Sequence, residues 1–416
     1  MKLALGRVCA VAAIIATACG GEEGAERLQK EEPARAELLS TSCVGIMPAA
    51  APASWTHVYS VDSDSGCGRD TSDASGNVML ERTHGPGGIF DSEEDDWDIF
   101  TTVGHQRGAV RQFDGARMFP QEWGFMTLGD HNGCGLNFNC KPDLGLRAWT
   151  ANGALIRSAT PTFEVWDVQL DLNGGVALVG LRPQQPFTIV SQRFDPHGNP
   201  LAFQAVVARG TTQPQFVVTG VSVSGLSLVL WNGDFSGFPE NSIVGRWVNR
   251  FGQAVTGTFL VARNAFRPSV TPLVDGSVAI QAFVSGLSIP RADWVALVGS
   301  GSTSVSPVPA WLAAHSDARV FIVRGGRAYA LLSPIDPGTC GAAHVTLFAT
   351  AGNRCGAFDV DSGAPGPTCA ADPWGNEPAF PLFASNIGRD GTLFVRGVTG
   401  EPGRNCKDRV FPALLR

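Results

Sequence analysis

The clearest pattern in this chain is a Gly-containing turn followed by alternating or continuous apolar residues, and it occurs seven times. A small turn followed by such a run predicts a β-hairpin strand. The copies are SGNVMLERT from Ser75, WGFMTLG from Trp123, NGGVALVGL from Asn173, SGLSLVLW from Ser224, DGSVAIQAF from Asp275, GGRAYALL from Gly325 and DGTLFVRGV from Asp390.

The spacing of these copies predicts the architecture. Anchored on one glycine each (76, 124, 175, 225, 276, 326 and 391), they lie 48 to 51 residues apart, except for a last interval of 65. A period near fifty made of strands and turns is typical of β-propeller blades. We therefore predict an all-β fold, a single β-propeller of about seven blades, with six or eight as alternatives. The ring is expected to close with strands from both chain ends, and the long interval predicts an enlarged blade between about 335 and 390.

A second motif places Arg before an aromatic residue at the end of a strand, followed by a turn. Its clearest copy is VSQRFDPHGNPL from Val190, with LRAWTANGALI from Leu146 and VGRWVNRFGQAV from Val244. Looser echoes start at Val110 and Val345. We expect the aromatic residues to fill the space between sheets, and the recurring Arg to pair with a neighbouring blade or cap a strand edge. The recurring Arg residues are 111, 147, 193 and 246.

With these R-(F/W)-x-x-x-G turns, residues 55–416 resemble exported bacterial β-propeller repeat lipoproteins. The resemblance implies the architecture and leaves the activity open, because propellers carry many functions.

Composition and charge narrow the function classes. The chain has 416 residues, 44% hydrophobic and 17% charged, which is typical of a globular protein. The net charge of −7 argues against nucleic acid as the main partner, since phosphate binding needs a basic face.

The N-terminus carries export signals. Lys2 and Arg7 precede a short apolar run, and Ala16-Thr17-Ala18 fits a signal-peptide cleavage site. The same residues resemble a bacterial lipobox with Cys19 as the lipidated residue, although Ala16 replaces the usual Leu. We predict a signal peptide at 1–18, a lipid-anchored flexible tether at 19–42 and the propeller domain at 43–416. By the sorting rules of lipoproteins, Gly20 after the Cys implies the outer membrane or cell surface; secreted or periplasmic protein is the alternative.

Cysteine parity supports lipidation of Cys19. Without Cys9 and Cys19 an even set of eight remains, which in an exported chain predicts disulfides. Guessed pairs are 43 with 67, 134 with 140, 340 with 355, and 369 with 406, and other pairings stay open. The eight disulfide candidates are Cys43, Cys67, Cys134, Cys140, Cys340, Cys355, Cys369 and Cys406.

Acidic residues give weak candidates for calcium. Asp62 and Asp64, and likewise Asp359 and Asp361, resemble the opening of a DxDxDG loop but lack the third acid. Asx turns explain them equally well. The acidic run at 91–98 is expected to be a solvated loop. No cofactor or metal is otherwise predicted.

No linear catalytic motif stands out. The seven His residues are scattered, HExxH and G-x-S-x-G are absent, and the Asp130-His131 pair has no partner motif. Six Trp residues in or beside loops could stack on sugars, but we expect core packing for most; they are Trp55, Trp97, Trp123, Trp231, Trp311 and Trp374.

The sequence thus favours a non-catalytic binding or scaffold module for an envelope or extracellular glycan or protein, attached to the membrane through its N-terminal lipid. The alternative is an extracellular hydrolase or lyase with its active site in the central channel, where acids from several blades could converge. A calcium-stabilised adhesin is a third, weaker hypothesis. The oligomeric state does not follow from the sequence.

Overall fold

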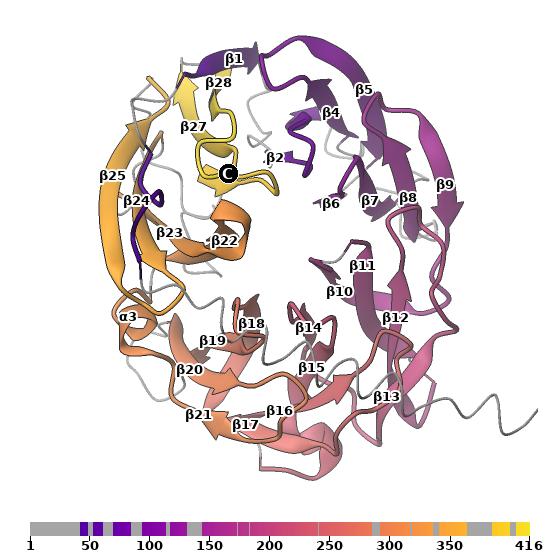
Figure 1. Ribbon diagram of the computed structural model, residues 1–416. Coiled ribbons are helices and arrows are strands. Elements are labelled where there is room, and N and C mark those ends of the chain that lie inside the picture. The colour runs from indigo at the N-terminus through magenta and orange to yellow at the C-terminus, as the bar shows by residue number, and fades with distance from the viewer. Residues whose placement is uncertain are drawn as a thin grey trace, which may run out of the picture.

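The structure is a seven-bladed β-propeller, shown by a computed structural model of the chain (Figure 1). It describes residues 42–48, 53–60, 70–84, 94–113, 117–130, 144–172, 174–182, 184–239, 241–284, 292–316, 318–335, 341–363, 385–399 and 405–416. Within these residues, seven antiparallel sheets of four strands each surround a central axis. The predicted fold class and blade number are confirmed.

Six blades are each built from four consecutive strands, the first of which lies nearest the axis. Blades 1 and 2 contain β2 (Thr71–Ser72), β3 (Val78–His84), β4 (Glu94–Phe100), β5 (Gln106–Phe113), β6 (Arg117–Pro120), β7 (Gly124–Asp130), β8 (Leu144–Thr150) and β9 (Leu155–Ala159). Blades 3 and 4 contain β10 (Glu164–Leu170), β11 (Val176–Arg182), β12 (Phe187–Phe194), β13 (Ala205–Gly210), β14 (Val217–Val221), β15 (Ser227–Asn232), β16 (Ser242–Val248) and β17 (Phe259–Arg263), with the short helix η1 (Gly233–Ser236). Blades 5 and 6 contain β18 (Ala265–Pro272), β19 (Val278–Val284), β20 (Ala292–Val298), β21 (Val305–Ser306), β22 (Arg319–Val323), β23 (Ala328–Pro334), β24 (Ala342–Ala349) and β25 (Arg354–Asp361), with α3 (Ala310–Ala313) and η2 (Arg324–Gly326).

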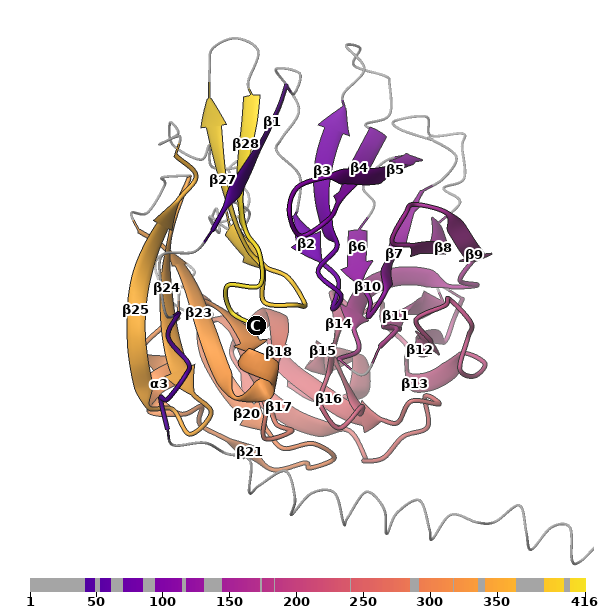
Figure 2. The same cartoon turned by 45° about the horizontal axis from the view of Figure 1, so that its top comes forward.

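The seventh blade closes the ring with strands from both chain ends, as predicted. It consists of β26 (Ser385–Ile387), β27 (Leu393–Thr399), β28 (Asn405–Phe411) and, as its outermost strand, β1 (Trp55–Ser60). β1 pairs antiparallel with β28 along its whole length, from Trp55 opposite Val410 to Ser60 opposite Asn405 (Figure 2). The hydrogen bonds of this pair join the two ends of the described chain.

All seven copies of the glycine-and-apolar motif form the second strand of a blade. In β11, Val176 to Leu181 are fully buried, as expected for a strand covered on both faces. The turn glycines adopt positive φ angles, for example 86° at Gly76 and 82° at Gly391, which favour glycine over other residues. In blade 3 the glycine at this place in the hydrogen-bonded turn is Gly174, whereas the sequence predicted Gly175.

The aromatic residues of the second motif are core residues at the ends of third strands. Trp149, Phe194, Trp247 and Phe348 are each at most 9% exposed, and each such burial contributes about 1.5–3 kcal/mol. The Trp247 Nε1 also donates a hydrogen bond to Ser302 O of the next blade at 2.9 Å. The looser echo at 110 is different, because it lies on the fourth strand β5 rather than on a third strand.

The acidic run does not form a solvated loop throughout, because its second half is part of β4, the third strand of blade 1. Asp96 and Asp98 are 8% and 3% exposed, and Trp97 between them is fully buried. Asp98 accepts a hydrogen bond from Gln106 Nε2 at 3.2 Å. The charge density of the sequence suggested exposure, but pairing with β3 and β5 buries these side chains.

Candidate functional site

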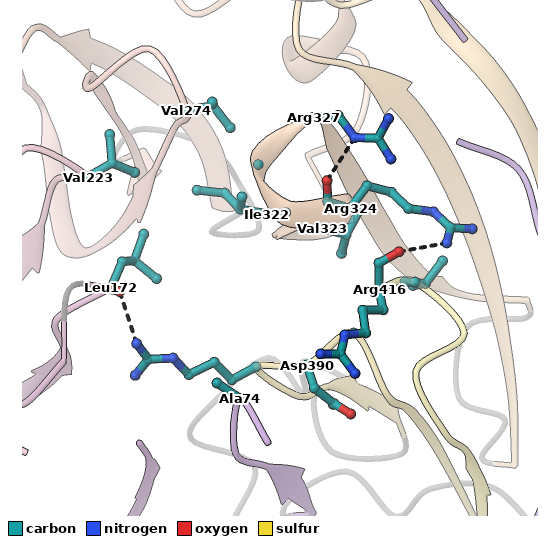
Figure 3. Close-up of a pocket in the computed structure, with 15 residues that line it drawn as sticks. Ala74, Leu172, Val223, Val274, Ile322, Val323, Arg324, Arg327, Asp390 and Arg416 are labelled. Atoms are coloured by element: carbon teal, nitrogen blue, oxygen red, sulfur yellow. Dashed lines mark hydrogen bonds between the residues drawn. The ribbon is translucent and has the colours of Figure 1, made fainter. Parts of the chain in front are cut away.

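The turns between the first and second strands of the blades converge on the propeller axis and line a cavity. This axial cavity has a volume of about 520 Å³, and the chain end at Arg416 lies within the ring (Figures 1 and 3). Its volume is within the usual range for small-molecule sites, about 300–1,000 Å³. Because Gly325, Arg327 and Arg416 in its wall are exposed, the cavity opens to solvent.

One side of the axial cavity is aliphatic. The residue that follows the first position of the turn is Ala74 in blade 1, Leu172 in blade 3, Val223 in blade 4 and Val274 in blade 5. Ile322 of β22 continues this surface, and Figure 3 shows these side chains on the walls of the cavity. No aromatic residue is among the described residues that line it.

The other side of the cavity is cationic. Arg324, the first residue of the turn in blade 6, lies there with Arg327 and Arg416. In blade 7 the residue that follows the first position of the turn is Arg389, whose guanidinium reaches across to Leu172 O. Asp390 is the one acidic side chain among the described lining residues. It already accepts hydrogen bonds from Ser72 Oγ at 2.5 Å, Thr392 N at 2.9 Å and Thr392 Oγ1 at 2.9 Å.

Arg324 joins both ends of the described chain beside the axial cavity. Its Nε donates to Ile46 O at 2.9 Å, and its Nη1 donates to the main-chain oxygen of Arg416 at 2.8 Å. Its own main-chain N–H donates to Leu415 O at 2.9 Å. Burial lowers the pKa of Arg324, and the neighbouring charge of Arg327 lowers it further. Arg324 therefore positions the C-terminal residues in the cavity wall.

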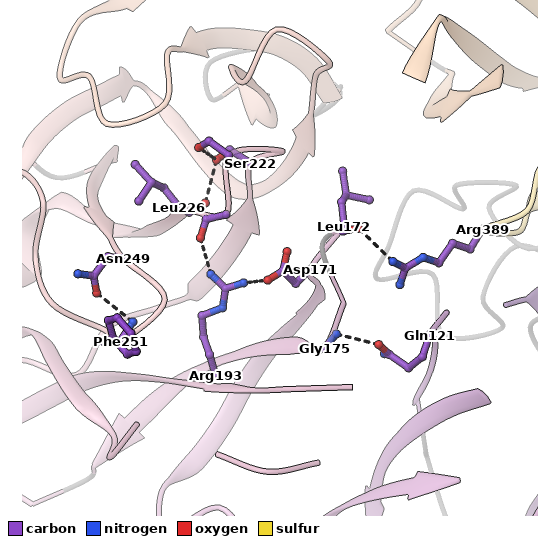
Figure 4. Close-up of polar contacts among 12 residues, drawn as sticks. Gln121, Asp171, Leu172, Gly175, Arg193, Ser222, Leu226, Asn249, Phe251 and Arg389 are labelled. Carbon is purple, nitrogen blue, oxygen red and sulfur yellow. Dashed lines mark hydrogen bonds and ion pairs between the residues drawn. The ribbon is translucent and has the colours of Figure 1, made fainter. Parts of the chain in front are cut away.

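Arg389 connects blade 7 with blades 2 and 3. Its Nη2 donates to Leu172 O at 3.0 Å and its Nη1 to Pro120 O at 3.4 Å (Figure 4). Burial lowers the pKa of Arg389, while the carboxylates of Glu122 and Asp73 act in the opposite direction. This guanidinium is thus partly satisfied by carbonyl groups.

Two of the recurring Arg residues of the second motif, Arg193 and Arg246, connect neighbouring blades. Arg193 forms an ion pair with Asp171 of its own blade, and its Nη1 donates to Gly225 O of blade 4 at 2.5 Å (Figure 4). Burial, with a smaller effect of Arg250, lowers the pKa of Arg193 to about 10. Arg246 donates to Val207 O of the preceding blade at 2.5 Å and to Thr258 Oγ1 at 3.0 Å. Arg246 also lines a second cavity, at the edge between blades 3 and 4, where its Nη1 and Nη2 atoms are engaged in these contacts.

An acidic side chain with a raised pKa lies in the channel wall. Asp167 of the first strand β10 accepts a hydrogen bond from Thr219 N at 2.8 Å and lies 3.8 Å from Arg117 Nη1. Burial raises its pKa to about 6, although these contacts act in the opposite direction. The groups that act against this rise are Thr219, Val168, Arg117 and Gln169, and none of them is a carboxylate.

The described calcium candidates are engaged with protein groups. Asp361 Oδ1 accepts a hydrogen bond from Gly363 N at 2.8 Å, which is an Asx turn, and contacts Arg409 Nη1 at 3.1 Å. Asp359 Oδ1 contacts His344 Nδ1 at 2.6 Å. Asp62 and Asp64 lie outside the described residues. In the described part of the chain, no three His, Cys, Asp or Glu side chains are grouped to hold a metal ion.

The disulfide prediction is partly corrected. Cys43 is bonded to Cys355, at the start of β25, and neither residue pairs with its guessed partner, Cys67 or Cys340. The segment around Ile46 crosses to blade 6, where Ile46 is 1% exposed in the core, and this path brings the two cysteines together. Cys406 is also disulfide-bonded. Its guessed partner, Cys369, lies outside the described residues. The same holds for Cys67, Cys134, Cys140 and Cys340.

Exposed aromatic side chains lie at the turn end of blades 2 to 4. Trp123 is 56% exposed and contacts His197 edge-on, with ring centroids 4.7 Å apart. Phe203 and Phe251, on the connections between third and fourth strands, are 95% and 44% exposed. By contrast, Trp97 and Trp231 are fully buried, as core packing predicts. Trp374, His131 and Cys19 lie outside the described residues.

Sequence reasoning did not find the axial cavity. The turn glycines were visible as markers, but the residue two positions earlier varies between aliphatic, acidic and basic types. A comparison of that position across the copies would have given the signal, because this residue lines the cavity in six of the seven blades.

Two further findings concern membrane-spanning helices and the compartment in which the protein folds. No helix among the described residues is long and apolar enough to cross a membrane. The disulfide indicates folding in an oxidising compartment.

Comparisons with known proteins identify similar folds and no family. No protein-family model and no curated protein matches the chain. Similar solved structures include the Dos1 propeller, at 9% identity over 88% of this chain and 95% of that chain with a TM-score of 0.43. Prolyl oligopeptidase B from Galerina marginata is 10% identical over 92% of this chain and 52% of that chain, with a TM-score of 0.45. A variant of the Synechocystis apocarotenoid oxygenase is 10% identical over 89% of each chain, with a TM-score of 0.42. At these values no argument about activity rests on the similarity.

Proposed function

We propose that this protein is a non-catalytic binding or scaffold module of the cell envelope that holds a glycan or a protein. The observation that carries the proposal is the axial cavity, which combines guanidinium donors with an aliphatic surface. No Ser, Cys or His is among the described residues that line it, and its one acidic side chain is fully hydrogen-bonded. Such a cavity can bind and orient a ligand, whereas nucleophilic or acid–base catalysis needs further groups.

The surface around the cavity supports contact with a partner. Trp123 and Phe203 lie at the same end of the propeller as the turns that line the cavity. Exposed aromatic side chains are enriched where proteins bind proteins, and Trp can also stack on a sugar ring. A ligand that enters the axial cavity could therefore extend across this surface.

The proposed address is the outer membrane or cell surface, with a lipid on Cys19. Its support is the lipobox-like sequence and the disulfide of Cys43, which fixes the start of the domain to blade 6. Cys355 directly follows the turn between β24 and β25, so the tether joins the domain at the turn end. A lipid anchor joined at this end would place the axial cavity toward the membrane.

The proposal is tested by incubating the exported protein with a panel of envelope and extracellular polysaccharides and with solubilised envelope proteins. Retention and released fragments are measured together. Retention of an intact ligand is expected, and Arg416→Gln should reduce it while Arg250→Gln, on the turn of blade 4, should not. Fragments, or no retention by any member of the panel, would refute the proposal.

The alternative function, a hydrolase or lyase acting in the channel, is favoured by one observation. Asp167 has a pKa of about 6 in the channel wall, which suits a general acid or base near neutral pH. Asp167→Asn would abolish fragment release in the same assay if this residue were catalytic.

A further inference from the structure

The division of the axial cavity into a cationic and an aliphatic side restricts the chemistry of its ligand. Leu172, Val223 and Val274 offer no hydrogen-bonding side chains, so the ligand must place apolar atoms against them. The arginines on the opposite side favour an oxyanion. A ligand that satisfies both carries a negative group directly beside an apolar group.

The available donors are those of Arg416. The Arg416 guanidinium makes no hydrogen bond or ion pair with any described residue, and in Figure 3 its side chain extends toward Asp390. Arg389 uses its Nη1 and Nη2 atoms on two carbonyl oxygens, the longer contact being 3.4 Å. Arg324 is occupied with the main-chain oxygens of Ile46 and Arg416. Arg327 donates its Nε to Arg324 O at 3.3 Å and in Figure 3 points away from Arg416.

Acidic neighbours do not cancel this cationic side. Asp73 is held within its own turn, where it accepts hydrogen bonds from Ser75 N at 3.0 Å and Asn77 N at 2.8 Å. Asp390 accepts hydrogen bonds from Thr392 and from Ser72 of blade 1. Glu122 is exposed on the turn of blade 2. Four guanidinium groups therefore line the cavity against one acidic side chain.

The geometry points to a free peptide carboxyl terminus with an apolar last residue as the ligand of the axial cavity. Its carboxylate would accept hydrogen bonds from Arg416, and its last side chain would contact Leu172 and Val223. The inference rests on the proposed function as a binding module and names its ligand class. An acidic glycan fits less well, because sugar rings are commonly bound on aromatic side chains, and the described lining has none.

The test compares two hexapeptides with identical sequences that end in Val-Leu, one as the free acid and one as the carboxyl-terminal amide. Isothermal titration with the exported protein should show at least about tenfold tighter binding of the acid, because hydrogen bonds to charged groups are strong and directional. Arg416→Gln should remove most of this difference. Arg250→Gln is the matched control, since Arg250 lies against the ring of Phe251 outside the cavity, and it should bind within twofold of the wild type.

The aliphatic side is tested separately with a peptide that ends in Gly. The wild type should prefer the Leu-ended acid by roughly tenfold, and Leu172→Asn should reduce that preference without removing the preference for acid over amide. Circular dichroism melting confirms that the variants are folded.

Each outcome has a defined meaning. Equal binding of acid and amide, an unchanged Arg416→Gln variant, or displacement of the peptide by an oligogalacturonate would overturn the inference. Failure of the peptides while another ligand is retained intact would refute the inference and leave the binding module standing. Shortening of the bound peptide would instead refute the non-catalytic proposal while confirming the carboxylate site.

Discussion

The blade that closes the ring contains a buried cluster of one Arg and two Asp side chains, and its removal gives a sharp test of how the propeller is held together. Arg396 of β27 forms an ion pair with Asp408 of β28, with 2.5 Å between Nε and Oδ1, and a second one with Asp70. Each of the three side chains is at most 5% exposed. Because Asp70 directly precedes β2, the cluster joins blade 7 to blade 1.

Replacing Arg396 by Met keeps much of the side-chain volume but leaves two buried carboxylates without their counter-charge. Breaking a buried ion pair from one side costs about 3–5 kcal/mol. For a domain of this size, that loss corresponds to a fall in melting temperature of roughly 4–6 °C.

The loss should depend on pH. Burial raises the pKa of Asp70 well above its ordinary value, and the charge of Arg396 opposes this rise. In Arg396→Met the pKa of Asp70 rises further, so the folded variant keeps a proton that the unfolded chain releases. A group with a raised pKa in the folded state contributes stability at low pH that is lost as the pH rises through that pKa. The difference between wild type and variant should therefore be larger at pH 8 than at pH 5.

The assay is thermal unfolding followed by circular dichroism at both pH values, without reductant. The matched control is Arg409→Met, because Arg409 lies on the neighbouring strand β28 and its partner Asp361 is 67% exposed. Exposed pairs contribute little to stability, so this control should melt within about 1 °C of the wild type. A loss in Arg396→Met no larger than that of the control, or one that is equal at pH 5 and pH 8, would show that the cluster does not hold the ring closed.

Three further predictions concern other parts of the ring. Cys43→Ser should destabilise the protein by about 2–5 kcal/mol in non-reducing buffer, and Cys355→Ser should add nothing further in the double variant, as thermal melting can show; additive losses would contradict this. Gly175→Ala should cost more than about 3 kcal/mol in chemical denaturation, because its Cβ would lie 2.0 Å from a main-chain oxygen of the neighbouring strand. Gly237→Ala, which has a similar positive φ angle but nothing within 4 Å, should cost about 1 kcal/mol, and equal costs would refute the steric argument. Because burial raises the pKa of Asp167 to about 6, wild-type stability should fall as the pH rises from 5 to 7.5, and Asp167→Asn should flatten this slope in melting experiments; an unchanged slope would assign it to other groups.

The features that the sequence could predict are those that depend on neighbouring residues. A turn with a positive φ angle needs glycine, and a strand covered on both faces needs a continuous apolar run, so Gly276 and the residues after it identify a second strand without any tertiary information. Repetition of that local rule made the blade number and the ring closure predictable.

The features that could not be predicted depend on residues that are far apart in the sequence. Cys43 and Cys355 are separated by 312 residues, and neither carries a local indication of its partner. Asp96 and Asp98 were assigned to a solvated loop because charge density usually indicates exposure, yet they lie in a strand that is paired on both sides. The contact of Arg324 with Ile46 likewise depends on where the N-terminal segment crosses blade 6.

The axial cavity follows from the way in which the propeller separates residues that maintain the fold from residues that face its axis. The glycine of each turn is required by the backbone, but the residue two positions before it only needs to be accommodated beside the axis. Val223 and Val274 stand at that position in adjacent blades 4 and 5, and Arg324 and Arg389 stand there in adjacent blades 6 and 7. Because equivalent positions of neighbouring blades lie side by side, this order along the chain becomes an aliphatic and a cationic side of one cavity. Exchanging Val274 and Arg324 in a double variant would interleave the two types without changing the composition. It should weaken ligand retention, and it should also lower the melting temperature, because the side chain of Arg324 binds the main-chain oxygens of Ile46 and Arg416.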